Sequence, residues 1–197
     1  MKSICLLTAV LVPLSVSLAD ETYSWDFQEL PSGWYADPDW EFGPDGAWVY
    51  LHTSSAGAPL TNDAEMTSET EPMIMPAGTY AVKVSISGSY NFGGGVNWDG
   101  MADACVCARA YLNGEYHTVL FDNETWDSDA RDETRPEPFN SVTFPAAEGD
   151  ALYFWLYARA SAMDGWANVM WEVTSLTAHI YIGSTLDRST WGRIKTL

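Results

Sequence analysis

Hydrophobic and polar residues alternate with a period of two along most of the chain, which is the pattern of β-strands with one buried face. The alternation is clearest at 80–86 and also marks strands at 23–27 and 47–53. A Ser-, Gly- and Pro-rich loop is expected at 54–63, followed by a weaker strand at 66–75. No segment has a convincing helical period, so the chain is predicted to be all-β.

A hairpin is predicted at Asn113-Gly114, because this dipeptide between two β-like runs favours a two-residue turn. The turn places Tyr111 opposite Tyr116, Arg109 opposite Thr118 and Cys107 opposite Leu120. One face of the hairpin is then expected in the core: Val106, Ala108, Ala110, Leu112, Val119 and Phe121. The other face carries Cys105, Cys107, Arg109, Tyr111 and Tyr116.

The segment 151–160 divides in the same way. Its apolar face is formed by Leu152, Phe154, Leu156 and Ala158, and its second face by Tyr153, Trp155, Tyr157 and Arg159. In the last strand region, 169–182, the alternation changes parity near Thr174 and Ser175, which predicts a β-bulge. These segments add up to about eight strands and predict a two-sheet antiparallel β-sandwich of the jelly-roll type.

Three regions are expected along the chain. Residues 1–19 have a positive start, a short apolar run and a small-residue ending at Ala19, as a secretory signal peptide has. The sandwich is expected over 20–183, and 184–197 form a basic tail that is either a sorting or docking signal or a frayed terminus. The mature protein is therefore predicted to be secreted, without membrane insertion.

The charge of the chain narrows the possible partners. With 27 acidic and 9 basic residues, its net charge is −18, which argues against nucleic acid and against direct binding to anionic lipid. Asn97, Asp99 and Asp103 form a candidate calcium cluster, since calcium prefers oxygen ligands. The cofactor prediction is therefore either none or a structural calcium ion. Cys105 and Cys107 lie two residues apart in a strand, near the upper limit for a disulfide, and are predicted to be reduced and buried.

The strings WDFQELPSGW, MPAGTYAVKVSISGSY and FPAAEGDALYFWLYARA give the chain a recognisable layout. It resembles bacterial extracellular jelly rolls of the cleaved-adhesin, MAM and carbohydrate-binding-module type over most of residues 23–183. The resemblance implies a non-catalytic adhesion or glycan-binding module, often with a structural calcium ion.

Aromatic residues are the main candidates for binding, because ten tryptophans and ten tyrosines exceed what a core of this size needs. Flat rings pack against the apolar faces of sugars while arginines donate to hydroxyls. The candidate residues on strands are Arg109, Tyr111, Tyr116, Tyr153, Trp155, Tyr157 and Arg159. Trp98 and Trp166, each beside Asp-Gly, are expected to be presented by loops at 97–103 and 163–168. The alternative is a central strand that is covered on both faces, with these rings in the core.

Catalytic motifs are missing from the sequence. His52, His117 and His179 stand singly, and Glu172 is expected to pair with Arg109 or Arg159 rather than to act as an acid. The preferred interpretation is a non-enzymatic glycan-binding module. The alternatives are a structural or adhesive surface protein that binds another protein or its own copies, and a glycosidase with a close pair of carboxylates in a concave groove beside Trp155 and Tyr157.

Overall fold

The computed structural model describes residues 19–127, 131–135 and 140–183, so most of the predicted signal peptide and the whole basic tail lie outside the described residues. The described part contains eleven strands and no helix. In chain order they are β1 (Glu21–Trp25), β2 (Tyr35–Ala36), β3 (Trp40–Gly43), β4 (Gly46–Ser55), β5 (Leu60–Thr67), β6 (Met73–Ile74), β7 (Thr79–Leu112), β8 (Glu115–Trp126), β9 (Arg131–Arg135), β10 (Asn140–Pro145) and β11 (Ala151–Ile182).

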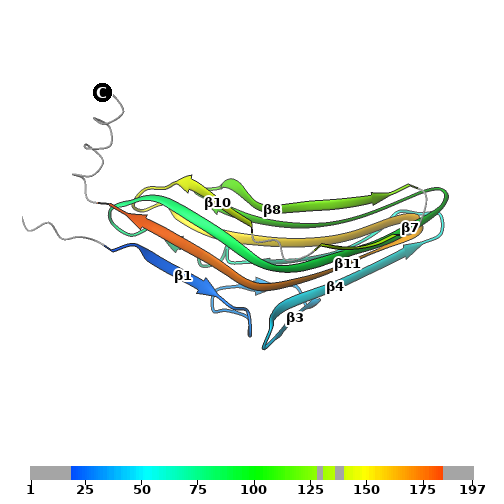
Figure 1. Ribbon diagram of the computed structural model, residues 1–197, viewed down its shortest axis with the longest axis horizontal. Coiled ribbons are helices and arrows are strands. Elements are labelled where there is room, and N and C mark those ends of the chain that lie inside the picture. Colours follow the sequence, from blue (N-terminus) through cyan, green and yellow to red (C-terminus); the bar gives the residue numbers. More distant parts are fainter. Residues whose placement is uncertain (1–18, 128–130, 136–139, 184–197) are drawn as a thin grey trace, which may run out of the picture.

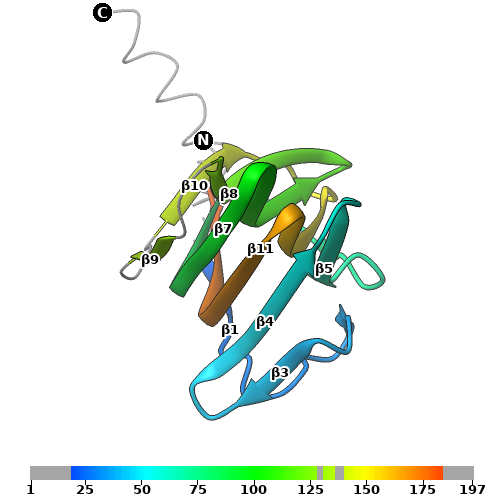
Figure 2. The same cartoon turned by 90° about the vertical axis from the view of Figure 1, so that its right-hand side faces the viewer.

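Two of these strands, β7 and β11, are long enough to cross the molecule twice. They pair with each other in antiparallel fashion from Leu112 and Leu152 at one end to Thr79 and Ile182 at the other. Figure 1 shows both strands running to one end of the molecule and turning back there, and Figure 2 shows the two bends side by side. The bends fold one hydrogen-bonded sheet into two layers, so the predicted all-β antiparallel sandwich is confirmed.

The two layers have different partners for the halves of β7 and β11. We call the first layer the groove sheet: β5, residues 151–163 of β11, residues 101–112 of β7 and β8 lie in it in that order, with β2 and β6 at its edge. We call the second layer the opposite sheet: residues 165–182 of β11 pair there with 79–96 of β7, and β1, β3, β4, β9 and β10 complete it.

The bends lie where loops were predicted. Residues 97–103 and 163–168 belong to β7 and β11, so the loop predictions were wrong. Asp164 has a positive φ of 51°, and the register shifts between Met163 and Gly165. A side chain at Gly165 would collide with the backbone of Gly95. The polar, glycine-containing stretches therefore bend the strands without ending the pairing.

Three other predictions about strands and loops have different outcomes. The bulge expected near Thr174 is confirmed, because the pairing of β11 with β7 shifts between Val173 and Ser175. The loop expected at 54–63 is confirmed only at 56–59, between β4 and β5, because β5 begins at Leu60. The strand expected at 66–75 has wrong bounds, since β5 ends at Thr67 and β6 covers only Met73–Ile74. β5 lies at the edge of the groove sheet and its sequence is mostly polar, so hydrophobic alternation could not reveal it.

The core lies between the layers and contains the inward residues of both sheets. Phe154 and Leu156 of the groove sheet and Trp171 of the opposite sheet are at most 1% exposed. Trp34 stacks on Phe154 at 6.1 Å and contacts Phe27 edge to face at 5.3 Å. Burying each such side chain stabilises the fold by roughly 1.5–3 kcal/mol. Because the core fixes every second residue of β11, the intervening residues must face outward.

Candidate functional site

Outward side chains of β11 form an aromatic row on the groove sheet. Tyr153, Trp155 and Tyr157 are half-buried, and they alternate with core residues such as Phe154 and Leu156. The period of two in the sequence causes this arrangement, because consecutive side chains of a strand point to opposite faces. The row is therefore part of the outer surface, and β7 and β8 on one side and β5 on the other supply its neighbours.

The rings of this row are held by stacking. Trp155 and Tyr157 stack with their centroids 4.9 Å apart and their planes 12° apart. Tyr111, on β7, stacks on Tyr153 at 4.7 Å with nearly parallel planes, and it lies 6.2 Å from Tyr116. Such contacts contribute about 0.5–1.5 kcal/mol each beyond the burial of area. The rings are therefore ordered before any ligand binds.

Carboxylates of β5 fix the other side of the row. The indole Nε1 of Trp155 donates to Glu65 at 3.0 Å, and the phenol of Tyr157 donates to Asp63 at 3.1 Å. Burial, together with the charge of Asp63 and the hydrogen bond to it, raises the pKa of Tyr157 to about 12. The phenol consequently stays neutral and keeps its hydrogen bond through the physiological range of pH.

Two arginines lie beside the row. The Arg109 guanidinium lies 4.6 Å from the ring centroid of Tyr116 and 5.2 Å from that of Trp155, within the range of cation–π attraction. Arg159 donates to Asp103 at 2.6 Å and forms an ion pair with it. The buried Nε atoms of both arginines have no hydrogen-bond partner among the described residues.

Phe121 was predicted to lie in the core but lies on the outer face of the groove sheet. The predicted pairs of Tyr111 with Tyr116 and of Arg109 with Thr118 are confirmed, but a bulge then shifts the register of β8 by one residue. Cys107 therefore faces Phe121 instead of Leu120, and Phe121 is 58% exposed. The run Val119-Leu120-Phe121 breaks the alternation, which was the available signal for a bulge.

The shifted register creates a groove of about 330 Å³ in the groove sheet. Trp155 and Tyr157 line one side of it and Phe121 the other, across the two cysteines between them on β7. Its eight lining residues are Cys105, Cys107, Arg109, Phe121, Asn123, Trp155, Tyr157 and Arg159.

The cysteines in the groove are free and buried, as predicted. Burial raises the pKa of both the Cys105 and the Cys107 thiols, and the nearby Arg159 and Arg109 oppose this rise only in part. The thiols therefore remain protonated at neutral pH and are poor nucleophiles. Their size matters more, because small side chains between large rings leave the hollow open.

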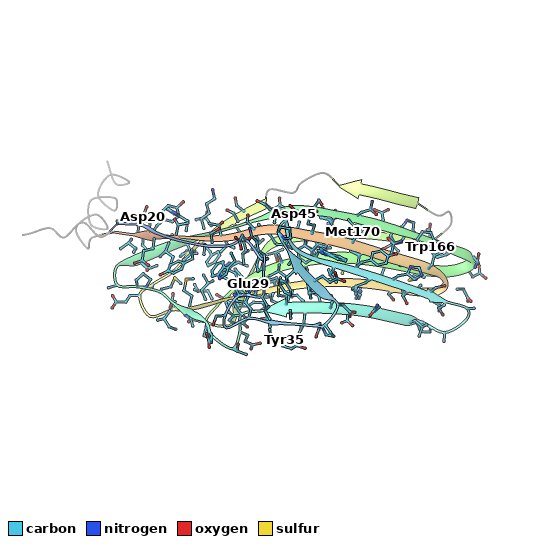
Figure 3. The ribbon with its side chains drawn as sticks, turned by 90° about the horizontal axis from the view of Figure 1, so that it is seen from below. Asp20, Glu29, Tyr35, Asp45, Trp166 and Met170 are labelled. Carbon is cyan, nitrogen blue, oxygen red and sulfur yellow. The ribbon has the colours of Figure 1, made fainter. Side chains whose placement is uncertain are left out.

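Seven of the nine predicted binding residues lie together on the outer face of the groove sheet: Arg109, Tyr111, Tyr116, Tyr153, Trp155, Tyr157 and Arg159. Trp166 does not join them. It lies past the bend of β11, where Figure 3 shows it on the same stretch as Met170, and it lines a separate hollow of about 520 Å³ with Ser54, Ser55 and Asn97. Trp98 lies within β7 near the bend.

Two of the candidate calcium ligands, Asn97 and Asp103, lie in different surroundings. Asp103 bonds Arg159, and Asn97 lines the hollow beside Trp166. Within residues 19–127, 131–135 and 140–183, no three His, Cys, Asp or Glu side chains are grouped to hold a metal ion, and calcium binding stays a prediction. The expected pairing of Glu172 with an arginine was wrong, since Glu172 lies in the opposite sheet and accepts from Ser89 at 3.3 Å.

Two of the three histidines have partners on separate strands. His179 is bonded to Thr22 at 2.8 Å, and His117 stacks on Phe144 at 3.9 Å. His52 lies 6.5 Å from the ring of Trp166. None of these histidine rings lines the groove, which offers aromatic rings, guanidinium groups, two thiols and an amide. No helix in the described part of the chain could span a membrane.

The sequence matches no protein-family model and has no significant similarity to a curated protein. Among solved structures, a CBM4 structure is 17% identical, with 74% of this chain and 94% of that chain covered and a TM-score of 0.21. The N-terminal cellulose-binding domain of β-1,4-glucanase C from Cellulomonas fimi is 19% identical, with 76% and 91% covered and a TM-score of 0.24. A structure of infectious bursal disease virus is 14% identical, with 93% and 43% covered and a TM-score of 0.26.

Proposed function

We propose that this protein is a secreted, non-catalytic module that binds glycan in the groove of the groove sheet. The observation that carries the proposal is a hollow with aromatic rings on both sides: Trp155 and Tyr157 face Phe121 across the cysteines. Pyranose rings have apolar C–H faces and hydroxyl edges, so a hollow of rings with polar groups at its margin fits their chemistry.

Preorganisation supports the same proposal. The stacking and the hydrogen bond to Glu65 hold Trp155 in one orientation, so little side-chain entropy is lost when a ligand binds. Asn123 and the two arginines supply donors at the groove for hydroxyl groups. A sugar chain would lie along the strands, with one residue between the rings and its neighbours over Tyr111 and Tyr153.

A glycan array followed by titration of the hits tests the proposal. We expect binding by the unmodified protein. Trp155→Ala should weaken this binding by about 30-fold, which corresponds to the loss of about 2 kcal/mol that is typical of a central interface residue. Trp48→Ala is the matched control, because Trp48 is a half-exposed tryptophan on the outer face of the opposite sheet. An array without any hit, or an equal loss in both variants, would contradict the proposal.

A surface protein that binds another protein is the second candidate. Exposed side chains on the outer face of the opposite sheet favour it: Trp48, Tyr50 and Met170 are 39%, 51% and 46% exposed and lie on neighbouring strands. The two candidates differ in the face that they use. Loss of partner binding in Tyr50→Ala, with Trp155→Ala unaffected, would favour the protein-binding function.

A further inference from the structure

The arginines of the groove stand out against the charge of the chain. The sequence has three times as many acidic as basic residues, 27 against 9. The eight groove residues reverse this balance, with two arginines and no acid among them. A groove for a neutral sugar does not require such a reversal, because hydroxyls can bond to Asp, Asn and Glu equally well.

The two guanidinium groups are not equivalent. Arg159 is neutralised by Asp103 at 2.6 Å, as an ordinary ion pair. Arg109 has no ion pair with a carboxylate of the described residues and is held instead between the rings of Tyr116 and Trp155. Arg109 is therefore the uncompensated positive charge of the groove.

The rings also determine which bonds Arg109 can form. Contacts with ring faces leave the edge of the planar guanidinium for N–H donation, and part of that edge is hydrogen-bonded to the side chains of Tyr111 and Cys107. Its Nε is buried and has no partner in the part of the chain that the structure describes. The Arg159 Nε is buried in the same way. Arg109 as a whole is half-buried, so its terminal N–H groups rather than its Nε are the donors that a ligand acceptor can reach.

We infer that the groove is selective for an acidic glycan and that Arg109 binds the carboxylate of a uronic acid residue stacked against Trp155. The inference rests on the proposed glycan-binding function and names its class of ligand. A carboxylate matches the guanidinium in geometry, because its two oxygens accept two parallel N–H bonds. Glu65 and Asp63 are carboxylates close to the groove, but they are bonded to Trp155 and Tyr157 from β5, across β11 from Arg109. More distant negative charges act weakly, since screening limits them to about 8 Å at physiological ionic strength.

Matched oligosaccharides test this selectivity on the unmodified protein. We would titrate β-1,4-linked hexamers of glucose and of glucuronic acid, and of mannose and of mannuronic acid, into the protein by calorimetry. In at least one pair the acidic hexamer should bind about tenfold more tightly than the neutral hexamer, because one charge-assisted hydrogen-bonding contact contributes about that factor to the affinity. Equal or tighter binding of the neutral hexamers would overturn the inference and leave the glycan-binding function standing, whereas no binding in these titrations or on the glycan array would refute both.

Charge variants on β7 locate the effect. Arg109→Gln should weaken binding of the acidic hexamer about tenfold more than binding of the neutral hexamer, so that the preference is lost, whereas Arg109→Lys should retain part of the preference as a single charge without the planar fork. Lys83→Gln is the matched control, because Lys83 is a cation on the opposite-sheet half of the same strand. An equal loss for acidic and neutral hexamers in Arg109→Gln would overturn the assignment. The hexamer comparison needs no variant, so the inference stays testable if Arg109→Gln fails to fold.

Discussion

The groove sheet and the opposite sheet are built from the same two strands, yet their outer faces differ. On the groove sheet, Trp155 is stacked, hydrogen-bonded to Glu65 and half-buried beside a hollow. On the opposite sheet, Trp48 and Tyr50 are 39% and 51% exposed, and Tyr50 faces Met170 of β11. Both faces therefore carry aromatic residues, but the groove sheet combines them with a row of stacked rings, two carboxylates bonded to that row and a hollow.

The difference shows that the number of exposed rings is a poor guide to a binding site. What distinguishes the groove is the order of its neighbours: carboxylates of β5 on one side, small cysteines of β7 beneath, and Phe121 of β8 on the far side. These neighbours fix the rings and leave room between them. Preorganisation of this kind lowers the entropic cost of binding.

The largest expected effect tests whether the contrast is confined to the outer faces. Phe154→Ala in the groove sheet and Trp171→Ala in the opposite sheet each remove a ring that is 1% exposed. Each should lower the free energy of unfolding by about 3–5 kcal/mol, because a large cavity remains. Urea unfolding followed by tryptophan fluorescence and circular dichroism measures this loss. A small loss in one variant would mean that the two inner faces also differ.

Outer-face tryptophans should differ in what they contribute to stability. Trp155→Ala removes ring stacking and the bond to Glu65, and it should lower the free energy of unfolding by about 1–2 kcal/mol. Trp48→Ala should stay within about 0.5 kcal/mol, as exposed substitutions usually do. The same urea experiment compares them. Equal losses would remove the distinction between a fixed row and exposed rings.

Phe121 tests the groove without disturbing the core. Because its side chain is 58% exposed, Phe121→Ala should leave the unfolding midpoint nearly unchanged and weaken glycan binding by about tenfold, or 1.4 kcal/mol. Titration of the strongest array ligand measures the affinity, and Phe121→Leu serves as a variant that keeps an apolar side chain without the ring. Unchanged affinity in Phe121→Ala would show that the ligand contacts Trp155 alone.

The smallest effect appears only at high pH. The pKa of Tyr157 is raised to about 12 by burial and by Asp63, whereas an unfolded tyrosine titrates near 10. Folding therefore favours the neutral phenol, so this contribution to stability is complete below pH 10 and is lost as the pH rises through about 12. The free energy of unfolding, measured with urea from pH 8 to 12, should decline less steeply in Tyr157→Phe than in the unmodified protein. Parallel pH dependences in the two proteins would mean that folding does not raise the pKa of Tyr157.

Local alternation in the sequence was sufficient for the aromatic row and the first part of the hairpin. Tyr153, Trp155 and Tyr157 share a face because they are two residues apart, and the turn at Asn113-Gly114 fixes Tyr111 opposite Tyr116. Asn113 and Gly114 have φ angles of 51° and 85°, as this type of turn requires. These features depend on neighbours along the chain, so a sequence can reveal them.

The remaining parts of the site depend on long-range pairing. Glu65 reaches Trp155 through the pairing of β5 with β11, which no local pattern specifies. Phe121 reaches the groove because one extra residue in β8 shifts its register, and a shift of one residue exchanges the faces of a strand. Trp166 was assigned to a loop because Asp164-Gly165 signals a turn, whereas here it bends a continuous strand.

The pairing of β7 with β11 has a consequence for the order of folding. The first pair, Leu112 with Leu152, closes the shortest loop, and the separation along the chain grows steadily to the last pair, Thr79 with Ile182. Shorter loops cost less entropy to close and form sooner. We therefore expect the pairing of these two strands to extend from the 113–151 connection through the bends, so that the groove sheet is assembled first and the opposite sheet forms on it.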